Sequence, residues 1–132
     1  MWTGNVLTND SFESSHRPSD RLIIKSAGRV IFVPVHEIDW IEASANYVRV
    51  HLAGGTSHLW RQPIGKIAEQ LDSSRFVRIH RSFIVNVSSI RELQPCNSGE
   101  FIVLLRDGKG LPGSRSHCQA LRALFSSVTR RD

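Results

Sequence analysis

Cysteine is scarce in this sequence, since only Cys96 and Cys118 occur among its 132 residues. Two cysteines cannot build a disulfide framework, and this pair lacks the C-x-x-C spacing of a metal or redox site. Long apolar runs are also missing: residues 101–105 are apolar, but Arg106 follows at once, whereas about 20 apolar residues are needed to cross a bilayer. The N-terminus has no apolar stretch of the secretory kind. We therefore expect free thiols, no membrane-spanning segment and a cytoplasmic location.

Motifs that catalysis or a cofactor would need are missing as well. The sequence contains neither the P-loop pattern nor G-x-G-x-x-G, which cradle phosphates. None of the six histidines has another histidine four residues away, as a helical zinc site would require. His80 with Ser82, or His117 with Cys118, could be imagined as a base and a nucleophile, but residues so close on an extended chain rarely face each other. We expect no enzymatic activity, no cofactor and no metal.

Positive charge is in excess, and it is unevenly distributed. The 17 Lys and Arg residues outnumber the 12 Asp and Glu residues, which gives a net charge of +5. No acidic residue lies between Asp72 and Glu92, or between Asp107 and Asp132. Segregated charge of this kind favours an anionic partner, although a basic composition alone is weak evidence. The Lys and Arg residues of these two intervals are Arg75, Arg78, Arg81 and Arg91 in the first, which also holds His80, and Lys109, Arg115, Arg122, Arg130 and Arg131 in the second.

The hydrophobic pattern predicts one mainly β domain. Residues 1–20 show no periodicity and are rich in Ser, Thr, Asn and Asp, so we expect a flexible leader or the remnant of a linker there. From residue 21, short runs rich in Val and Ile alternate with turn residues, which is typical of a β fold. Strands are expected at 22–25, 29–33, 39–43, 47–52, 57–61, 76–79, 90–94, 100–105 and near Leu111.

Side-chain alternation and turn residues refine this prediction. In 47–52, Val48, Val50 and Leu52 share one face, so that face is expected in the core and the other in solvent. Ala27-Gly28, Gly54-Gly55 and Asp107-Gly108 suit hairpin turns. Residues 63–71 and 116–128 show helical periodicity, so each is expected to form a short amphipathic helix. The six phenylalanines are expected mostly in the core; they are Phe12, Phe32, Phe76, Phe83, Phe101 and Phe125.

The segment 76–86, FVRIHRSFIVN, carries the densest chemical signal. It could be a core strand pair with an ordinary solvated face. However, its polar residues are Arg, His, Ser and Asn, with no acid, beside apolar anchors. The planar guanidinium of Arg suits phosphate or guanine, and a Ser hydroxyl suits phosphate oxygen. Ser114-Arg115-Ser116, at the expected start of the last helix, is a second candidate anion site, although an N-cap Ser with a surface Arg would explain it equally well.

Three segments together resemble the LytTR DNA-binding domain of bacterial transcription regulators. They are IDWIEASANYVRVHL from residue 38, FVRIHRSFIVNVSSIREL from residue 76 and VLLRDGKGLPGSRSHCQALRALF from residue 103. The resemblance predicts that residues 21–126 form a LytTR-like domain, followed by a tail at 127–132. It implies elongated antiparallel β-sheets with one or two short helices, and a protein that reads DNA through loops and bends it.

The resemblance also implies which residues contact DNA. Asn46 and Tyr47 fall in the first reading loop, His80, Arg81 and Ser82 in the second, and Ser114 and Arg115 in the third. Tyr47 is expected to stack or pack at the interface, and Glu42 to have a structural role, orienting an Arg or closing a loop. We expect base-edge contacts from Arg81 and Arg115, and phosphate or mixed contacts from Asn46, Arg49, Arg78, His80 and Ser114.

The expected partner is double-stranded DNA, with two copies of a monomeric protein binding direct repeats in a promoter. Since LytTR domains commonly follow a receiver or a membrane segment, the chain is either a single-domain regulator or a fragment of a longer one. Two alternatives are an RNA or single-strand binding β module, which would need several aromatic residues on one sheet face, and a protein-interaction domain.

Overall fold

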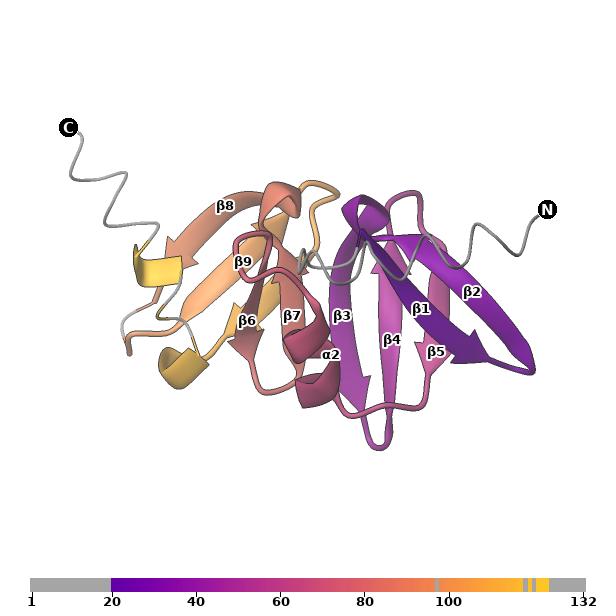
Figure 1. Cartoon of the computed structure of the whole chain (residues 1–132). Coiled ribbons are helices and arrows are strands. Elements are labelled where there is room, and N and C mark those ends of the chain that lie inside the picture. Colours follow the sequence, from indigo (N-terminus) through magenta and orange to yellow (C-terminus); the bar gives the residue numbers. More distant parts are fainter. Residues whose placement is uncertain (1–19, 97, 118, 120, 124–132) are drawn as a thin grey trace.

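A computed structural model describes residues 20–96, 98–117, 119 and 121–123 of the chain (Figure 1). The described part is mainly β, as the sequence predicts. The described part contains the α-helix α2 (Ile64–Gln70) and three short 3-10 turns, η1 (Val35–Glu37), η2 (Val87–Ser89) and η3 (Arg115–His117). The strands are β1 (Arg21–Ser26), β2 (Arg29–Pro34), β3 (Ile38–Ser44), β4 (Tyr47–Leu52), β5 (Ser57–Trp60), β6 (Phe76–His80), β7 (Phe83–Asn86), β8 (Ile90–Pro95), β9 (Phe101–Leu105) and β10 (Gly110–Gly113).

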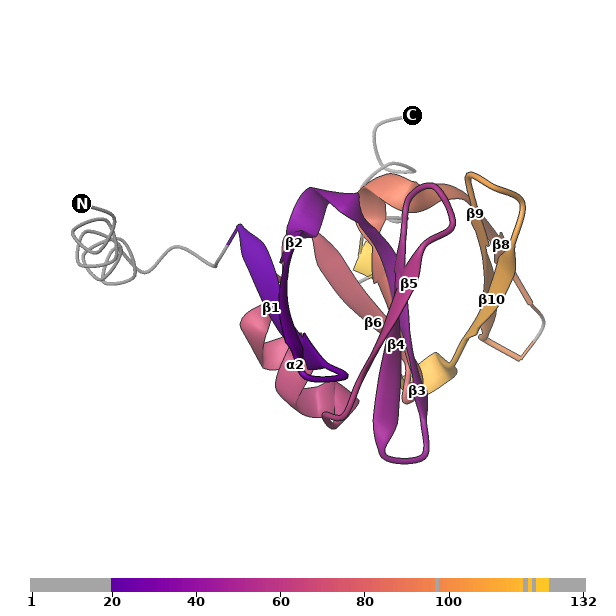
Figure 2. The same cartoon turned by 90° about the vertical axis from the view of Figure 1, so that its right-hand side faces the viewer.

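The strands form three antiparallel sheets arranged in layers. A central sheet has the order β5-β4-β3-β7-β6. The β1-β2 hairpin and α2 lie on one side of it, and the sheet β10-β9-β8 lies on the other (Figure 2). The prediction of elongated antiparallel sheets with short helices is therefore confirmed.

Strands β3 and β7 of the central sheet contribute to a core on each face, since neighbouring residues of one strand point in opposite directions. Ile41 and Ile84 face the hairpin and α2, whereas Trp40 and Val85 face the three-stranded sheet. The first core also contains Leu22, Ile24, Val33, Val48, Val50, Ile64 and Ile67, and the second contains Val77, Ile79, Phe101, Val103, Leu105, Leu111 and Leu121. Strands β3 and β7, each of which borders a turn of this sheet, are thus packed into both cores.

Strand β7 was not among the predicted strands, although its apolar residues were expected in the core. Its sequence is FIVN, with Ile84, Val85 and Asn86 all buried. A strand that is covered on both faces shows a continuous apolar run and no alternation. The run alone therefore did not distinguish a strand from another buried segment.

Phe32 is not in the core, which contradicts the prediction. Its side chain is 59% exposed, on the outer face of the β1-β2 hairpin, directly opposite Ile23 in the strand register. The hairpin packs against the first core through its inner face alone. Only the apolar side chains that point inward can therefore be buried. Phe76 and Phe101 are buried as predicted, whereas Phe12 and Phe125 lie outside the described residues.

The predicted turns and helices are largely confirmed. Ala27, Gly28, Gly54, Gly55 and Gly108 have positive φ, as such hairpin turns require. The predicted helix at 63–71 is α2. The predicted helix at 116–128 begins with the 3-10 turn η3, and residues 119 and 121–123 are helical. The rest of that helix, the tail at 127–132, Cys118 and the leader at 1–19 lie outside the described residues.

The described helices include none that is long and apolar enough to span a membrane.

Candidate nucleic-acid interface

The three predicted reading loops lie at one edge of the structure, the lower edge in Figure 1. They are the β3-β4 turn, the β6-β7 turn and the segment at η3. Two backbone hydrogen bonds link them: the N–H of Ala43 donates to the carbonyl of Ser82 at 2.8 Å, and the N–H of Ser114 donates to the carbonyl of Ile79 at 2.7 Å. The loops are therefore fixed relative to one another by the sheets that carry them.

Arg78 holds the β6-β7 turn. Its Nε donates to the carbonyl of His80 at 3.3 Å, and its Nη2 donates to the carbonyl of Arg81 at 2.7 Å. Hydrogen bonds from a charged donor are stronger than neutral ones, so the guanidinium fixes the backbone of the turn. The phosphate contact expected from the sequence stays a prediction, and the structure adds that Arg78 positions the turn.

His80 is held in the same turn as an acceptor. The backbone N–H of Ser82 donates to Nδ1 of His80 at 3.0 Å, so the contact between these residues does not pair a base with a hydroxyl nucleophile. Burial lowers the pKa of His80 below its usual value of 6.5, and the nearby charges of Arg81, His117 and Arg78 lower that pKa further. The turn therefore favours the neutral form of the His80 imidazole over the charged form.

The pKa of His80 predicts a pH dependence of stability. In the range between the lowered folded pKa and 6.5, the unfolded chain binds more protons than the folded chain, so stability falls as the pH falls. His80→Asn keeps an acceptor near the position of Nδ1 but does not titrate. In urea unfolding from about pH 8 to about pH 5, the wild type should lose more stability than this variant. A constant difference between the two proteins across the range would contradict the assignment.

The Arg81 side chain is exposed at the tip of the β6-β7 turn. Within the described part of the chain, no hydrogen bond or ion pair uses its guanidinium; only its backbone carbonyl accepts a bond, from Arg78. An exposed guanidinium on a rigid turn is available for bidentate contact with a base edge or a phosphate.

In the third loop, Ser114 and Arg115 have partners within the chain. Ser114 Oγ lies 3.0 Å from Nδ1 of His117, and Nε of Arg115 donates to the carbonyl of Ser98 at 3.0 Å. Arg115 thus lies against the β8-β9 turn, so part of its guanidinium is committed there. The chain leaves β10 through a 3-10 turn and not an α-helical turn. Ser114 therefore does not lie at the N-terminus of an α-helix, where the helix dipole would favour an anion.

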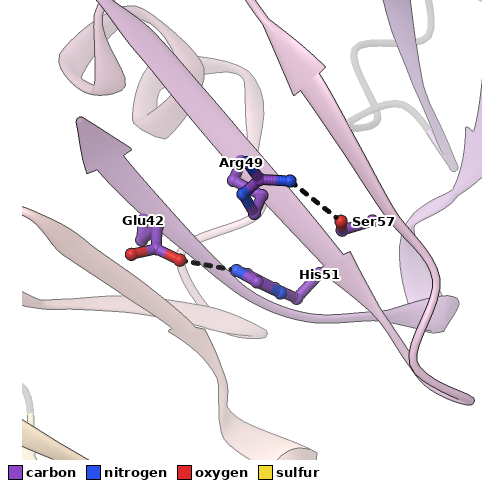
Figure 3. Close-up of polar contacts among 4 residues, drawn as sticks. All are labelled: Glu42, Arg49, His51 and Ser57. Carbon is purple, nitrogen blue, oxygen red and sulfur yellow. Dashed lines mark hydrogen bonds and ion pairs between the residues drawn. The ribbon is translucent and has the colours of Figure 1, made fainter. Parts of the chain in front are cut away.

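The first loop is followed by an exposed strand pair. Asn46 is exposed in the turn, and Tyr47 is 40% exposed. The Arg61 guanidinium carbon lies 5.3 Å from the Tyr47 ring centroid, and Nη1 of Arg49 donates to Ser57 Oγ at 3.3 Å (Figure 3). Sequence reasoning missed both Arg61 and His117. The register of β5 on β4 could have placed Arg61 next to Tyr47, since Trp60 pairs with Val48.

Glu42 has a structural contact, although its partner is not an arginine. Its Oε1 lies 2.7 Å from Nε2 of His51 (Figure 3). The His51 ring stacks on Trp40 at 3.9 Å between centroids, with an angle of 5° between planes. The bonded pair Glu42 and His51 therefore covers Trp40 at the edge of the second core.

Among the described residues, no group of three or more His, Cys, Asp or Glu side chains is placed to hold a metal ion. The interface instead gathers basic and hydroxyl side chains on three neighbouring loops. Such a surface can bind an extended polyanion through phosphate contacts and direct hydrogen bonds.

Comparison with known proteins agrees with this geometry. Residues 28–126 match the family model of the LytTr DNA-binding domain. The chain is 27% identical over 113 residues to the sensory transduction protein LytT of Bacillus subtilis, covering 86% of this chain and 46% of that protein. It is 31% identical over 110 residues to the transcriptional regulatory protein YpdB of Escherichia coli, covering 83% and 45%.

A solved structure, described as the LytTr DNA-binding domain of a response regulator from Bacillus cereus, superposes with a TM-score of 0.71 at 25% identity. The superposition covers 81% of this chain and 97% of the other. The chain spans about half the length of the curated relatives it matches. The family match and the shared fold together establish that this chain belongs to the LytTR family of DNA-binding domains.

Proposed function

We propose that this chain binds double-stranded DNA sequence-specifically, as the DNA-binding part of a bacterial transcription regulator in the cytoplasm. The observation that carries the proposal is the placement of three loops at one edge, with basic side chains that are not neutralised. Arg49, Arg61, Arg78, Arg81 and Arg115 form no ion pair with any carboxylate of the described residues. Unneutralised arginines on rigid turns supply the phosphate contacts that dominate DNA affinity.

The proposed roles follow the surroundings of each residue. Arg81 reads a base edge, because its guanidinium is exposed and no described residue bonds it. Arg115 also contacts a base edge, through the guanidinium nitrogens that do not bond the carbonyl of Ser98. Ser82 supports the second turn, and Tyr47 packs against the duplex. Asn46, Arg49, His80 and Ser114 contact phosphates, alone or together with bases, whereas Arg78 acts chiefly by shaping the turn.

Three loops on one edge fit successive grooves of a duplex, and we propose that this engagement bends the DNA. Two copies bind side by side on direct repeats, each arriving as a monomer. One named relative is a transcriptional regulatory protein, and no catalytic activity is proposed for this chain. A single-strand binding module fits less well, since exposed Tyr47 and Phe32 lie on different sheets and form no common stacking surface.

Selection from a pool of random duplexes tests this function. The chain is incubated with the pool at two salt concentrations, and the bound fraction is sequenced and its affinity measured by fluorescence anisotropy. We expect a short motif occurring as direct repeats, and an affinity whose logarithm falls with the logarithm of salt at about 0.9 per neutralised phosphate. Binding without an enriched motif would refute the sequence specificity, and a lack of binding would refute the function.

A further inference from the structure

The outer face of β4 and β5 is left uncovered beside the first loop. Val48, Val50 and Trp60 point into the first core. The residues between them, together with Arg61 just after β5, point to the opposite side. No residue of β4 or β5 is among the described members of the second core, so the three-stranded sheet does not cover this half. We call Tyr47, Arg49, Ser57, Leu59 and Arg61 the β4-β5 face.

This face is exposed and positively charged. Arg49 and Arg61 are both exposed, and Leu59 is 42% exposed between them. Glu42 lies directly opposite Arg49 in the strand register and would be its natural ion-pair partner. However, its carboxylate is bonded to His51, and Arg49 bonds the neutral hydroxyl of Ser57 (Figure 3). The positive charge of Arg49 is therefore not cancelled.

Arg61 is held in place at the same edge as the reading loops. The chain leaves β5 at the lower edge in Figure 1, near the β3-β4 turn. The guanidinium of Arg61 rests over the ring of Tyr47, and such a contact between a cation and an aromatic ring is favourable at exposed sites. A side chain that is already ordered loses less conformational entropy when it binds. The Arg61 side chain is thus already ordered for binding an anion beside the first loop.

We propose that the DNA backbone extends from the first loop onto the β4-β5 face, where Arg61 and Arg49 each bind a phosphate and Leu59 lies against the sugars. The inference rests on the proposed function and adds Arg61 as a contact residue. Charge complementarity and continuity with the β3-β4 turn identify the occupant as the DNA backbone. Contacts of this kind add affinity and fix the register without reading sequence.

Salt dependence of binding tests the two arginines. Arg61→Ala and Arg49→Ala should each lower the salt slope by about 0.9 on every duplex, while the ratio of cognate to scrambled affinity stays unchanged. Arg61→Lys should retain the slope, because a phosphate contact needs the charge more than the planar group. Arg75→Ala is the matched control, since Arg75 is exposed just before β6, at the opposite end of that strand from the β6-β7 turn; its slope should equal that of the wild type.

Photo-crosslinking tests proximity without changing charge. A benzophenone amino acid at position 59 should crosslink to a bound duplex, whereas the same amino acid at position 32, on the outer face of the hairpin, should not. If the wild type binds its selected duplex but position 59 gives no crosslink and Arg61→Ala keeps the full slope, the inference is wrong and the proposed function stands. If the wild type binds no duplex, both are wrong. Thermal unfolding of each variant confirms that it is folded.

Discussion

Replacing Trp40 with alanine is expected to lower the free energy of unfolding by about 3–5 kcal/mol, the usual cost of removing a large buried aromatic side chain. Trp40 is 6% exposed and lies in the second core. It stacks against His51, and the Nζ of Lys109 lies 5.3 Å from its ring centroid. Its removal leaves a cavity at the junction of the central and three-stranded sheets, and urea unfolding measures the loss.

Phe32→Ala is the matched control for Trp40→Ala, because it removes another aromatic side chain from a strand. Phe32 is largely exposed on the hairpin, so its replacement should change stability by no more than about 0.5 kcal/mol. Equal losses for the two variants would show that the second core does not depend on Trp40.

Arg81→Ala should weaken binding to the selected duplex by about 1–3 kcal/mol and reduce the discrimination between cognate and scrambled duplexes. The reason is the free guanidinium of Arg81 at the tip of a turn that Arg78 holds rigid. A bidentate base contact carries both affinity and specificity. Anisotropy titrations with the two duplexes at one salt concentration measure both effects.

The control for Arg81 is again Arg75→Ala, which removes one positive charge away from the loops. It should leave the ratio of cognate to scrambled affinity as in the wild type. If Arg81→Ala also leaves that ratio unchanged and lowers only the overall affinity, Arg81 binds phosphate and does not read a base.

The sequence predicts a strand well where one face is buried and the other is exposed to solvent. In β4, Val48 and Val50 are buried and Arg49 is exposed, so alternation identifies both the strand and its faces. Alternation fails in β7, which is buried on both sides. It also fails in β2, where both sets of alternating residues contain apolar side chains and only packing decides that Val33 is buried and Phe32 is not.

The candidate site was predicted by residue type but not by contacts. The group His80, Arg81 and Ser82 stands out in the sequence because it lacks acids, and the structure places it on one turn. The bonds of Arg78 were not predicted because its partners are backbone carbonyls, which have no signature in a sequence. Arg61 was missed because its contact with Tyr47 depends on strand pairing across a loop.

The burial of strands β3 and β7 on both faces has a consequence for partial unfolding. Strands β3 and β7 contribute side chains to both cores, so detachment of the hairpin or of the three-stranded sheet still leaves them held by the remaining core. Subglobal opening of a folded protein follows such packing units. The β3-β4 and β6-β7 turns therefore keep their relative geometry when an outer layer opens, whereas the segment at η3, which follows β10, moves with the three-stranded sheet.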